Sequence, residues 1–342
     1  MAKNLFIKIL FFLFFLALLF FGAVFPHQER KNPNQQPLPF LDMDGQKDDQ
    51  KRPAVLFFTG DIMLDRGVEW MAEKKGEGNA EFPFLDIKEF LKQADFLFGN
   101  LEGPVSDKGA KAGSIYSFRA DPKFLKGLKE AGFDAVSVAN NHMMDYGGAA
   151  MEDTFLRLKS EGIDYAGGGF SEEEAFSAKF FDILGQKVAI LAFTSVGSEK
   201  WAAQGDRSGI AWAGGEISGR IEDAAKEAPI VIVSFHWGQE YQKENDQSQK
   251  YLAHLAVDKG ADLVVGHHPH VVQNSERYKD GYIFYSLGNF IFDQSFSEET
   301  MEGLLLKVVI DDNGIKEVSP VAIQMNEKFQ PEIKKQQNEI QQ

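Results

Sequence analysis

Polar residues that can bind metal ions stand in five short clusters along this chain, and each cluster directly follows an apolar run. Neutral imidazoles, carboxylates and amide oxygens together form a ligand set for Zn, Mn or Fe(II). A carboxylate such as Glu102 can bridge two ions about 3.5–4 Å apart. His268 and His270 stand two residues apart, so both rings face the same way on an extended strand. The clusters contain Asp61; Asn100 and Glu102; Asn140, Asn141, His142 and Asp145; His236; and His267, His268 and His270.

A single cluster of this kind has an ordinary structural explanation. A Gly-Asp pair is commonly a turn, an Asn-Asn pair accepts a left-handed backbone, and a lone histidine at a strand end is more often a hydrogen-bonded structural residue. Turns do not easily explain all five clusters, and five of the seven histidines lie in them. The pattern therefore predicts one shared polar site and favours a divalent metal ion there, Mn, Zn or Fe, as one ion or two.

The apolar runs before the clusters predict strands buried inside a sheet. The clearest of them are short, continuously apolar runs, the pattern of a strand covered on both faces. Ligand sites in open α/β sheets lie at the carboxyl ends of such strands, so we expect the clusters to converge. The strands are expected at residues 54–59, 95–98, 135–139, 230–235 and 263–265.

Helical patterns alternate with these strands, and two hairpins accompany them. One hairpin is expected over residues 180–193, around Gly185-Gln186, and the other over 304–323, around Asp311-Asp312-Asn313-Gly314. The alternation and the late hairpin together predict an α/β sandwich with some strands parallel and some antiparallel. Helices are expected at residues 87–94, 122–131, 151–158 and 246–259.

Length and composition restrict the class of protein. The 342 residues allow two domains or one large α/β domain. The hydrophobic fraction of 44% supports a sizeable core and excludes wholesale disorder. The net charge of −15 argues against binding of nucleic acid, because phosphates need a basic surface. The absence of cysteine from the sequence excludes disulfides, thiolate metal ligands and a cysteine nucleophile.

Residues 1–26 are predicted to form a transmembrane helix that anchors the chain. The seventeen residues from Ile9 to Phe25 carry no charge, which is near the lower limit for crossing a bilayer at about 1.5 Å per residue. The alternatives are a cleaved signal peptide, for which residues 22–25 offer a poor cleavage site, and a buried soluble helix. Lys3 and Lys8 favour a cytoplasmic N-terminus. We therefore expect a single-pass protein of the cell membrane whose C-terminal body is extracytoplasmic.

The remainder of the chain divides by composition. Residues 27–53 are rich in Pro, Gln, Asn, Asp and Lys and are predicted to be a flexible linker. Residues 54–325 are expected to form the folded body. Residues 326–342, which end in a Gln-rich stretch, are expected to be a disordered tail.

Six longer motifs contain or follow these clusters and succeed one another along the chain. They are Gly60-Asp61-Ile62-Met63-Leu64, Asn100-Leu101-Glu102-Gly103-Pro104, Asn140-Asn141-His142, His236-Trp237-Gly238-Gln239-Glu240-Tyr241, Gly266-His267-His268-Pro269-His270 and Ser286-Leu287-Gly288-Asn289-Phe290-Ile291-Phe292-Asp293-Gln294. Together they resemble the CapA-type poly-gamma-glutamate capsule-synthesis family, over about Val55 to Val309. That family is similar in fold to the metallo-dependent phosphatases, the calcineurin-like phosphoesterases, which implies an α/β/β/α sandwich of mixed sheets. Its members commonly carry an N-terminal membrane anchor with the body outside.

The resemblance to the phosphoesterases implies a role for each residue of the clusters. Glu102 takes the place of their bridging aspartate, Asn141 that of an amide ligand, and His142 that of a histidine near the leaving group. The implied metal ligands are Asp61, Glu102, Asn141, His236, His268 and His270, and the implied catalytic residues are His142 and Asp61.

Two positions depart from the phosphoesterase pattern. Their first motif is Asp-x-His, but Met63 stands where the histidine is expected. The bridging position holds Glu102, which is one methylene longer than aspartate. One metal position therefore lacks a good ligand, which implies a single ion or a weak second one.

Four further residues are candidates for contact with a substrate. Arg66 and Arg119 are suited to clamp a carboxylate or a phosphate, and a surface salt bridge is the equal alternative for each. Asn289 either binds the substrate or only holds a loop. Glu240 either lines the cleft or orients a metal ligand, while Trp237 is expected to pack in the interior.

Three functions remain open on this basis. The leading one is a membrane-anchored extracytoplasmic protein that acts in synthesis or export of an anionic polymer such as poly-gamma-glutamate, with membrane synthesis or export partners. It would carry a metal-dependent hydrolase site for a phosphoester or amide bond. The second is a polymer-handling or assembly subunit without catalysis, which Met63 favours. The third is a secreted metallophosphoesterase with a cleaved signal.

We expect the full chain to sediment with membranes and to stay there through a carbonate wash, because the uncharged run of residues 9–25 suits a bilayer span. Fractionation of the expressing cells, followed by detection of the chain in each fraction, measures this. A shortened chain in the medium would instead support a cleaved signal.

Overall fold

The computed structural model describes residues 52–112, 115–214 and 217–334. The predicted transmembrane segment, and the linker up to Lys51, lie outside these residues. Within the described ranges, none of the helices is both long enough and apolar enough to span a bilayer.

Two mixed sheets form the centre of the described body. The first sheet has the order β16-β15-β14-β1-β2-β3-β4, and β13 also pairs with β1. β1 to β4 run parallel, whereas β14 is antiparallel to β1. Its strands are β1 (Ala54–Ile62), β2 (Phe96–Leu101), β3 (Ala135–Ser137), β4 (Asp164–Ala166), β13 (Asn289–Ile291), β14 (Glu302–Asp311), β15 (Gly314–Met325) and β16 (Pro331–Ile333).

The second sheet has the order β11-β12-β10-β9-β7-β6. β7, β9, β10 and β12 run parallel, and an antiparallel strand closes each edge. The predicted mixture of parallel and antiparallel strands is thus confirmed, as are both hairpins, β6–β7 and β14–β15. The strands are β6 (Lys179–Ile183), β7 (Gln186–Thr194), β9 (Ile230–His236), β10 (Leu263–His267), β11 (Ser275–Tyr278) and β12 (Gly281–Phe284), and a separate pair is formed by β5 (Gly168–Gly169) and β8 (Gly209–Ile210).

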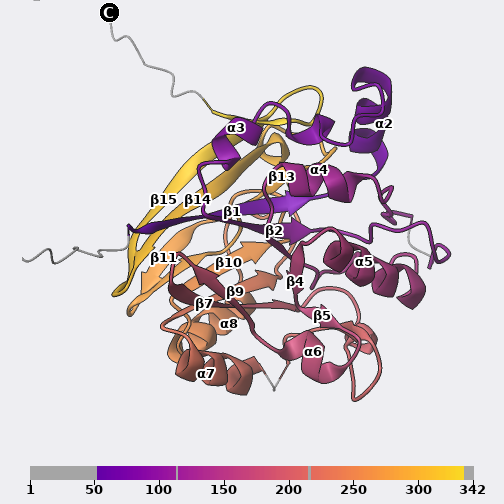
Figure 1. Cartoon of the computed structure of the whole chain (residues 1–342). Coiled ribbons are helices and arrows are strands. Elements are labelled where there is room, and N and C mark those ends of the chain that lie inside the picture. The colour runs from indigo at the N-terminus through magenta and orange to yellow at the C-terminus, as the bar shows by residue number, and fades with distance from the viewer. Residues whose placement is uncertain (1–51, 113–114, 215–216, 335–342) are drawn as a thin grey trace, which may run out of the picture. The chain divides into compact units, whose positions relative to one another are not determined.

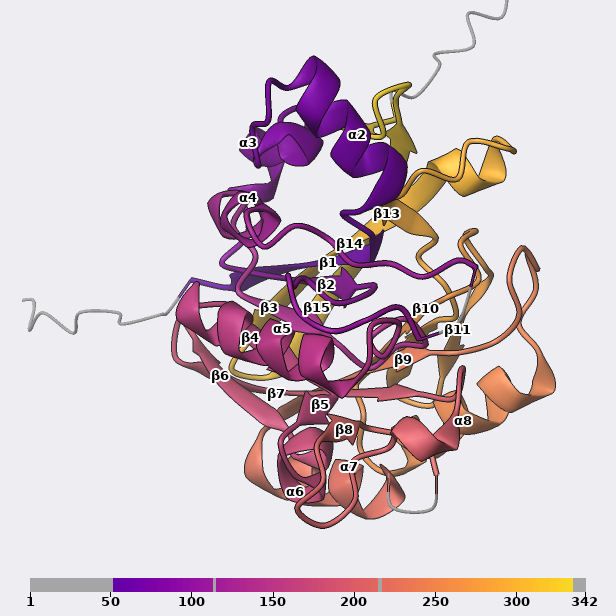
Figure 2. The same ribbon diagram turned by 90° about the vertical axis from the view of Figure 1, so that its right-hand side faces the viewer.

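Helices cover the outer face of each sheet, so the body has four layers. Figure 1 shows α2, α3 and α4 beside the first sheet and α7 and α8 beyond the second, and the turned view of Figure 2 shows the same layers. The helices are α2 (Arg66–Lys75), α3 (Lys88–Leu91), α4 (Phe124–Glu130), α5 (Gly148–Ser160), α6 (Glu172–Phe176), α7 (Ile217–Glu227) and α8 (Gln247–Asp258), with 3₁₀ turns at Phe82–Phe84, Glu199–Trp201 and Glu299–Met301.

The alternation of β1 explains why this strand is apolar throughout. Phe57 packs among the helices on the outer face, whereas Leu56 and Phe58 belong to the apolar cluster between the two sheets. Ile232 of β9 and Val265 of β10 contribute to the same inner cluster from the second sheet. A strand covered on both faces needs apolar side chains at successive positions.

β13 lies against the carboxyl-terminal end of β1, because the chain can approach closely there. A Cβ atom at Gly60 would lie 2.0 Å from the carbonyl oxygen of Gly288, so only glycine permits this approach. The pairing places Asn289 opposite Asp61.

Two expectations are corrected by the structure. The helix predicted over residues 87–94 is limited to α3, because Asp95 exchanges hydrogen bonds with the backbone of Val55 and β2 begins directly after it. The tail predicted to be disordered from residue 326 is ordered at least to Lys334, since β16 pairs with β15. The buried side chain of Gln330 holds this segment by donating a 2.6 Å hydrogen bond to the carbonyl oxygen of Phe82.

Replacing Gln330 by alanine should lower the free energy of unfolding by about 1–3 kcal/mol, because the buried carbonyl of Phe82 loses its partner. Chemical denaturation of the wild type and the variant measures the change. Glu327→Ala is the matched control, since Glu327 is an exposed residue of the same loop. An equal stability of all three chains would show that the hydrogen bond from Gln330 to Phe82 contributes nothing to the fold.

Candidate metal centre

Four parallel strands from the two sheets end at one place, and their last residues form the centre. Asp61 lies near the end of β1, and Glu102 directly follows β2. His236 ends β9 and His267 ends β10, and the two residues are partners across the second sheet. The convergence predicted from the strand ends is therefore present.

Asp61, Glu102 and His270 form the buried core of the centre. One potential ligand atom of each lies within 4.8 Å of those of the other two. His270 Nδ1 lies 3.5 Å from Asp61 Oδ2, and His270 Nε2 lies 3.7 Å from Glu102 Oε1. Asp61 also accepts hydrogen bonds from Asn100 Nδ2 at 2.8 Å and from the backbone N–H of His268 at 3.1 Å. Its carboxylate is therefore held in one orientation.

The protonation of these groups follows from burial and from their neighbours. Burial, together with the negative charge of Asp61, raises the pKa of Glu102. Burial and the adjacent His270 lower the pKa of His268 to about 3, and burial lowers the pKa of His236 as well. Burial alone would also lower the pKa of His270, but Glu102 and Asp61 outweigh it and raise that pKa to about 9. His236 and His268 are thus neutral, the form that binds metals.

The backbone at His268 and His270 is strained. His268 has a φ of 95° and His270 a φ of 58°, a region that residues other than glycine seldom adopt. The neighbouring Tyr241, with a φ of 63°, bonds through its N–H to the carbonyl oxygen of Pro269 at 2.8 Å. Such strain persists where surrounding contacts impose it, and it concentrates at functional sites.

Unpartnered buried atoms show that the donor set fits a cation. In residues 52–112, 115–214 and 217–334, the atoms without a hydrogen-bond partner include Glu102 Oε1, His268 Nδ1 and both ring nitrogens of His267. Leaving such atoms unsatisfied is costly, and two carboxylates buried together add repulsion. A divalent ion would relieve both, and imidazoles with carboxylates suit Zn, Mn or Fe(II).

Asn141 and His236 also converge as predicted. His236 Nε2 lies 2.7 Å from Asn141 Oδ1, and His236 Nδ1 lies 3.3 Å from Asn100 Nδ2. Asn100 therefore touches Asp61, Glu102 and His236 at once.

A cleft of about 550 Å³ opens onto the centre. His142 lies on its wall, stacked on Phe118 with ring centroids 4.0 Å apart. His142 Nδ1 lies 2.7 Å from Asp145 Oδ2, and its Nε2 lies 3.8 Å from Glu102 Oε1. Asp145 and Phe118 thus fix the ring with one nitrogen toward the centre. The cleft is lined by Arg66, Tyr116, Phe118, Asn141, His142, Glu240, Tyr241, His270, Asp293, Gln294 and Phe296.

Of the four residues predicted to contact a substrate, two line the cleft and two do not. Arg66 and Glu240 line the cleft, and Arg66 Nε donates to Asp293 Oδ2 at 3.0 Å. Arg119 does not line it, because its guanidinium lies 4.2 Å from the centre of the Tyr146 ring and donates to Lys108 O. Asn289 is buried, with Oδ1 3.0 Å from His270 Nδ1, so it holds a histidine and does not line the cleft.

Comparison with known proteins places the chain in a family. The model of the family described as "Bacterial capsule synthesis protein PGA_cap" matches residues 55–294. The chain belongs to this family. It is 35% identical over 286 residues to the capsule biosynthesis protein CapA of Bacillus anthracis, covering 80% of this chain and 69% of the relative. It is 38% identical over 272 residues to the PGA biosynthesis protein CapA of Bacillus subtilis (strain 168), covering 78% and 70%.

The crystal structure of a novel phosphatase from Mycoplasma pneumoniae aligns with this PGA_cap chain with a TM-score of 0.48 and 14% identity, covering 80% of this chain and 94% of that one.

Three residues of this PGA_cap chain lie at the centre although the sequence pattern predicted no role for them. Asn100 and Asp145 belong to the sequence clusters, and their spacing could have indicated a role at the centre. Asn100 is two residues from Glu102, and Asp145 is three residues from His142. His267 ends β10, with Nδ1 3.4 Å from Asp61 Oδ1 but without hydrogen-bond geometry. Trp237, as expected, is packed inside and donates to Tyr285 O at 2.8 Å.

Met63→His tests the missing ligand of this PGA_cap chain. Met63 is fully buried in an apolar cluster, so an imidazole there should cost about 1–3 kcal/mol of stability in the presence of a chelator. Mn or Zn at 100 times its Kd for this second position should stabilise the variant by about 2.7 kcal/mol more than it stabilises the wild type, with bound metal rising towards two ions per chain. Thermal unfolding and elemental analysis measure these effects.

Met151→His is the matched control for this variant, because Met151 is equally buried in the same apolar cluster but lies on α5. Metal should stabilise this variant only as much as it stabilises the wild type, because both keep the same centre. Equal recovery of both variants would contradict a second metal position beside Asp61.

Proposed function

We propose that this chain acts in the synthesis or export of an anionic capsule polymer such as poly-gamma-glutamate, and that its centre is a divalent-metal site with hydrolase chemistry. Membership of the PGA_cap family supports the polymer pathway. The printed names of the two Bacillus relatives, a capsule and a PGA biosynthesis protein, support the same pathway. We place the body outside the cytoplasm, held at the membrane by residues 1–26, on the sequence pattern alone.

One observation carries the metal site. Glu102 Oε1 is buried without a hydrogen-bond partner among the described residues, and Glu102, Asp61 and His270 each offer one potential ligand atom within 4.8 Å of the other two. The residues that would hold an ion are Asp61, Glu102, Asn141, His236, His268 and His270. A divalent ion in such a site supplies Lewis-acid activation of a scissile bond and of water.

The residues around the cleft have their own parts in this chemistry. His142, with Nδ1 fixed by Asp145, presents Nε2 to the centre and can donate a proton to a leaving group as a general acid. Phe118 stacks on that ring and prevents it from turning. Asp61 is fully buried and does not line the cleft. Its carboxylate would therefore hold and orient the ion and would not touch a substrate.

A polymer-handling subunit without catalysis is the second candidate function, and Met63 favours it. Its side chain is buried, and its sulfur accepts a hydrogen bond from the N–H of Asp65 at 3.1 Å. The position that would complete an Asp-x-His pair with Asp61 is therefore occupied by a packed thioether.

His236→Ala should purify with little metal after loading with Mn or Zn and should remain folded. Loss of a direct metal ligand lowers metal affinity by more than the roughly 10–100-fold that follows loss of a residue hydrogen-bonded to a ligand. The fold of a body of this size does not depend on one ion. Elemental analysis and circular dichroism measure the two effects. Hydrolysis of generic phosphodiester and gamma-glutamyl amide substrates should fall with the metal content.

The control is His254→Ala, because His254 lies on α8, where it contacts Glu276 and Tyr278. That variant should keep its metal. Negligible metal in the wild type and both variants would rule out the metallohydrolase and leave the polymer-handling function.

A further inference from the structure

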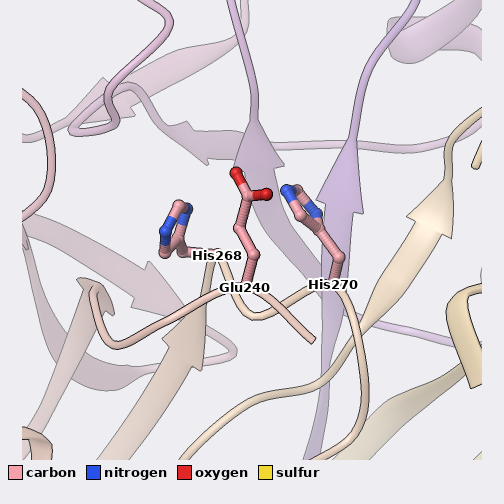
Figure 3. A group of neighbouring side chains, drawn as sticks. All are labelled: Glu240, His268 and His270. Carbon is pink, nitrogen blue, oxygen red and sulfur yellow. The ribbon is translucent and has the colours of Figure 1, made fainter. Parts of the chain in front are cut away.

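Glu240 lies on the loop that follows β9, at the mouth of the cleft. Its neighbour Tyr241 bonds through its N–H to Pro269 O, which ties this loop to the turn that carries His268 and His270. Figure 3 shows the carboxylate of Glu240 extending between the rings of the two histidines. Glu240 is exposed, whereas both histidines are buried.

The three side chains present a ligand set of their own. One atom from each of Glu240, His268 and His270 lies within 4.8 Å of the other two. His268 Nδ1 is buried and has no hydrogen-bond partner among the described residues. Within the described ranges, no lysine or arginine forms an ion pair with Glu240, although many surface carboxylates of this acidic chain do so elsewhere. We propose that Glu240 is a metal ligand that completes, with His268 and His270, a zinc-type site facing the cleft.

The donor set indicates which ion this site would take. Two imidazoles and one carboxylate, with further positions open, form the protein ligands of one class of catalytic zinc site. Mg²⁺ and Ca²⁺ prefer oxygen ligands throughout. Glu240 and His270 both line the cleft, so an ion held by them would be reached from the cleft, where His142 also lies.

The inference rests on the proposed metal function and extends it. His270 belongs both to this group and to the buried group with Asp61 and Glu102, so the two groups adjoin. Glu240 thereby adds, from a loop, a third ligand to the two histidines. Its role is then in the metal centre itself, and not only in lining the cleft.

The test is Zn²⁺ binding to the full chain in detergent, after removal of metal by a chelator and dialysis. Competition with a chromogenic chelator gives the affinity, and the visible spectrum of the Co²⁺-loaded chain reports the ligand set. Glu240→Gln should weaken Zn²⁺ binding by at least about 100-fold, beyond the effect of an outer partner, and should change the Co²⁺ spectrum. Glu240→His, which keeps a donor atom, should retain most of the affinity.

Glu244→Gln is the matched control, because Glu244 is an exposed carboxylate of the same loop that belongs to neither ligand group. It should bind Zn²⁺ as the wild type does. Unchanged affinity and spectrum in Glu240→Gln, with Zn²⁺ still bound, would overturn this inference and leave the proposed metal site intact. An equal loss of Zn²⁺ affinity in Glu240→Gln and Glu244→Gln would also overturn it, because removal of any negative charge from the loop would then have the same effect. No Zn²⁺ bound by the wild type would overturn the proposed metal function as well.

Discussion

Two carboxylates, Asp61 and Glu102, are buried side by side where β1 and β2 end, and this is the constraint on which the centre depends. Their mutual repulsion and their removal from water are both unfavourable. The chain surrounds them with donors: Asn100, the backbone of His268, and the ring of His270. Oε1 of Glu102 still lacks a hydrogen-bond partner within the described residues. A cation is the group that best completes this arrangement.

The two sheets meet this constraint because their parallel strands end at the same edge. β1 and β2 supply the carboxylates from one sheet, and β9 and β10 supply histidines from the other. The apolar cluster between the sheets fixes their separation. The strands thus hold the buried side chains of the centre, while a strained turn and a loop present His270 and Glu240 from the cleft side. This division suits a site that must be stable on one side and accessible on the other.

The cleft is not a simple basic clamp for an anionic polymer. Arg66 is already paired with Asp293, which also accepts a hydrogen bond from the N–H of Gly67 in the first turn of α2. Arg119 is directed to Tyr146 and to backbone carbonyls. A partly exposed ion pair of this kind contributes little net charge or energy. Recognition of a polyanion at this wall would therefore need Asp293 to release Arg66, or the bound cation itself.

The sequence alone determined the parts that depend on local pattern. Short apolar runs predicted β1, β2, β9 and β10, and the position of polar residues after them predicted Asp61, Glu102, His236 and His268 at one edge. Local pattern also missed elements whose existence depends on distant partners, such as β16, which forms only against β15. The roles of Asn289, Arg119 and Glu240 were decided by tertiary structure, because each depends on which distant segment packs against it. A carboxylate on a loop shows no periodic spacing signal, and long-range bonds such as that between Tyr241 and Pro269 place Glu240 beside two histidines.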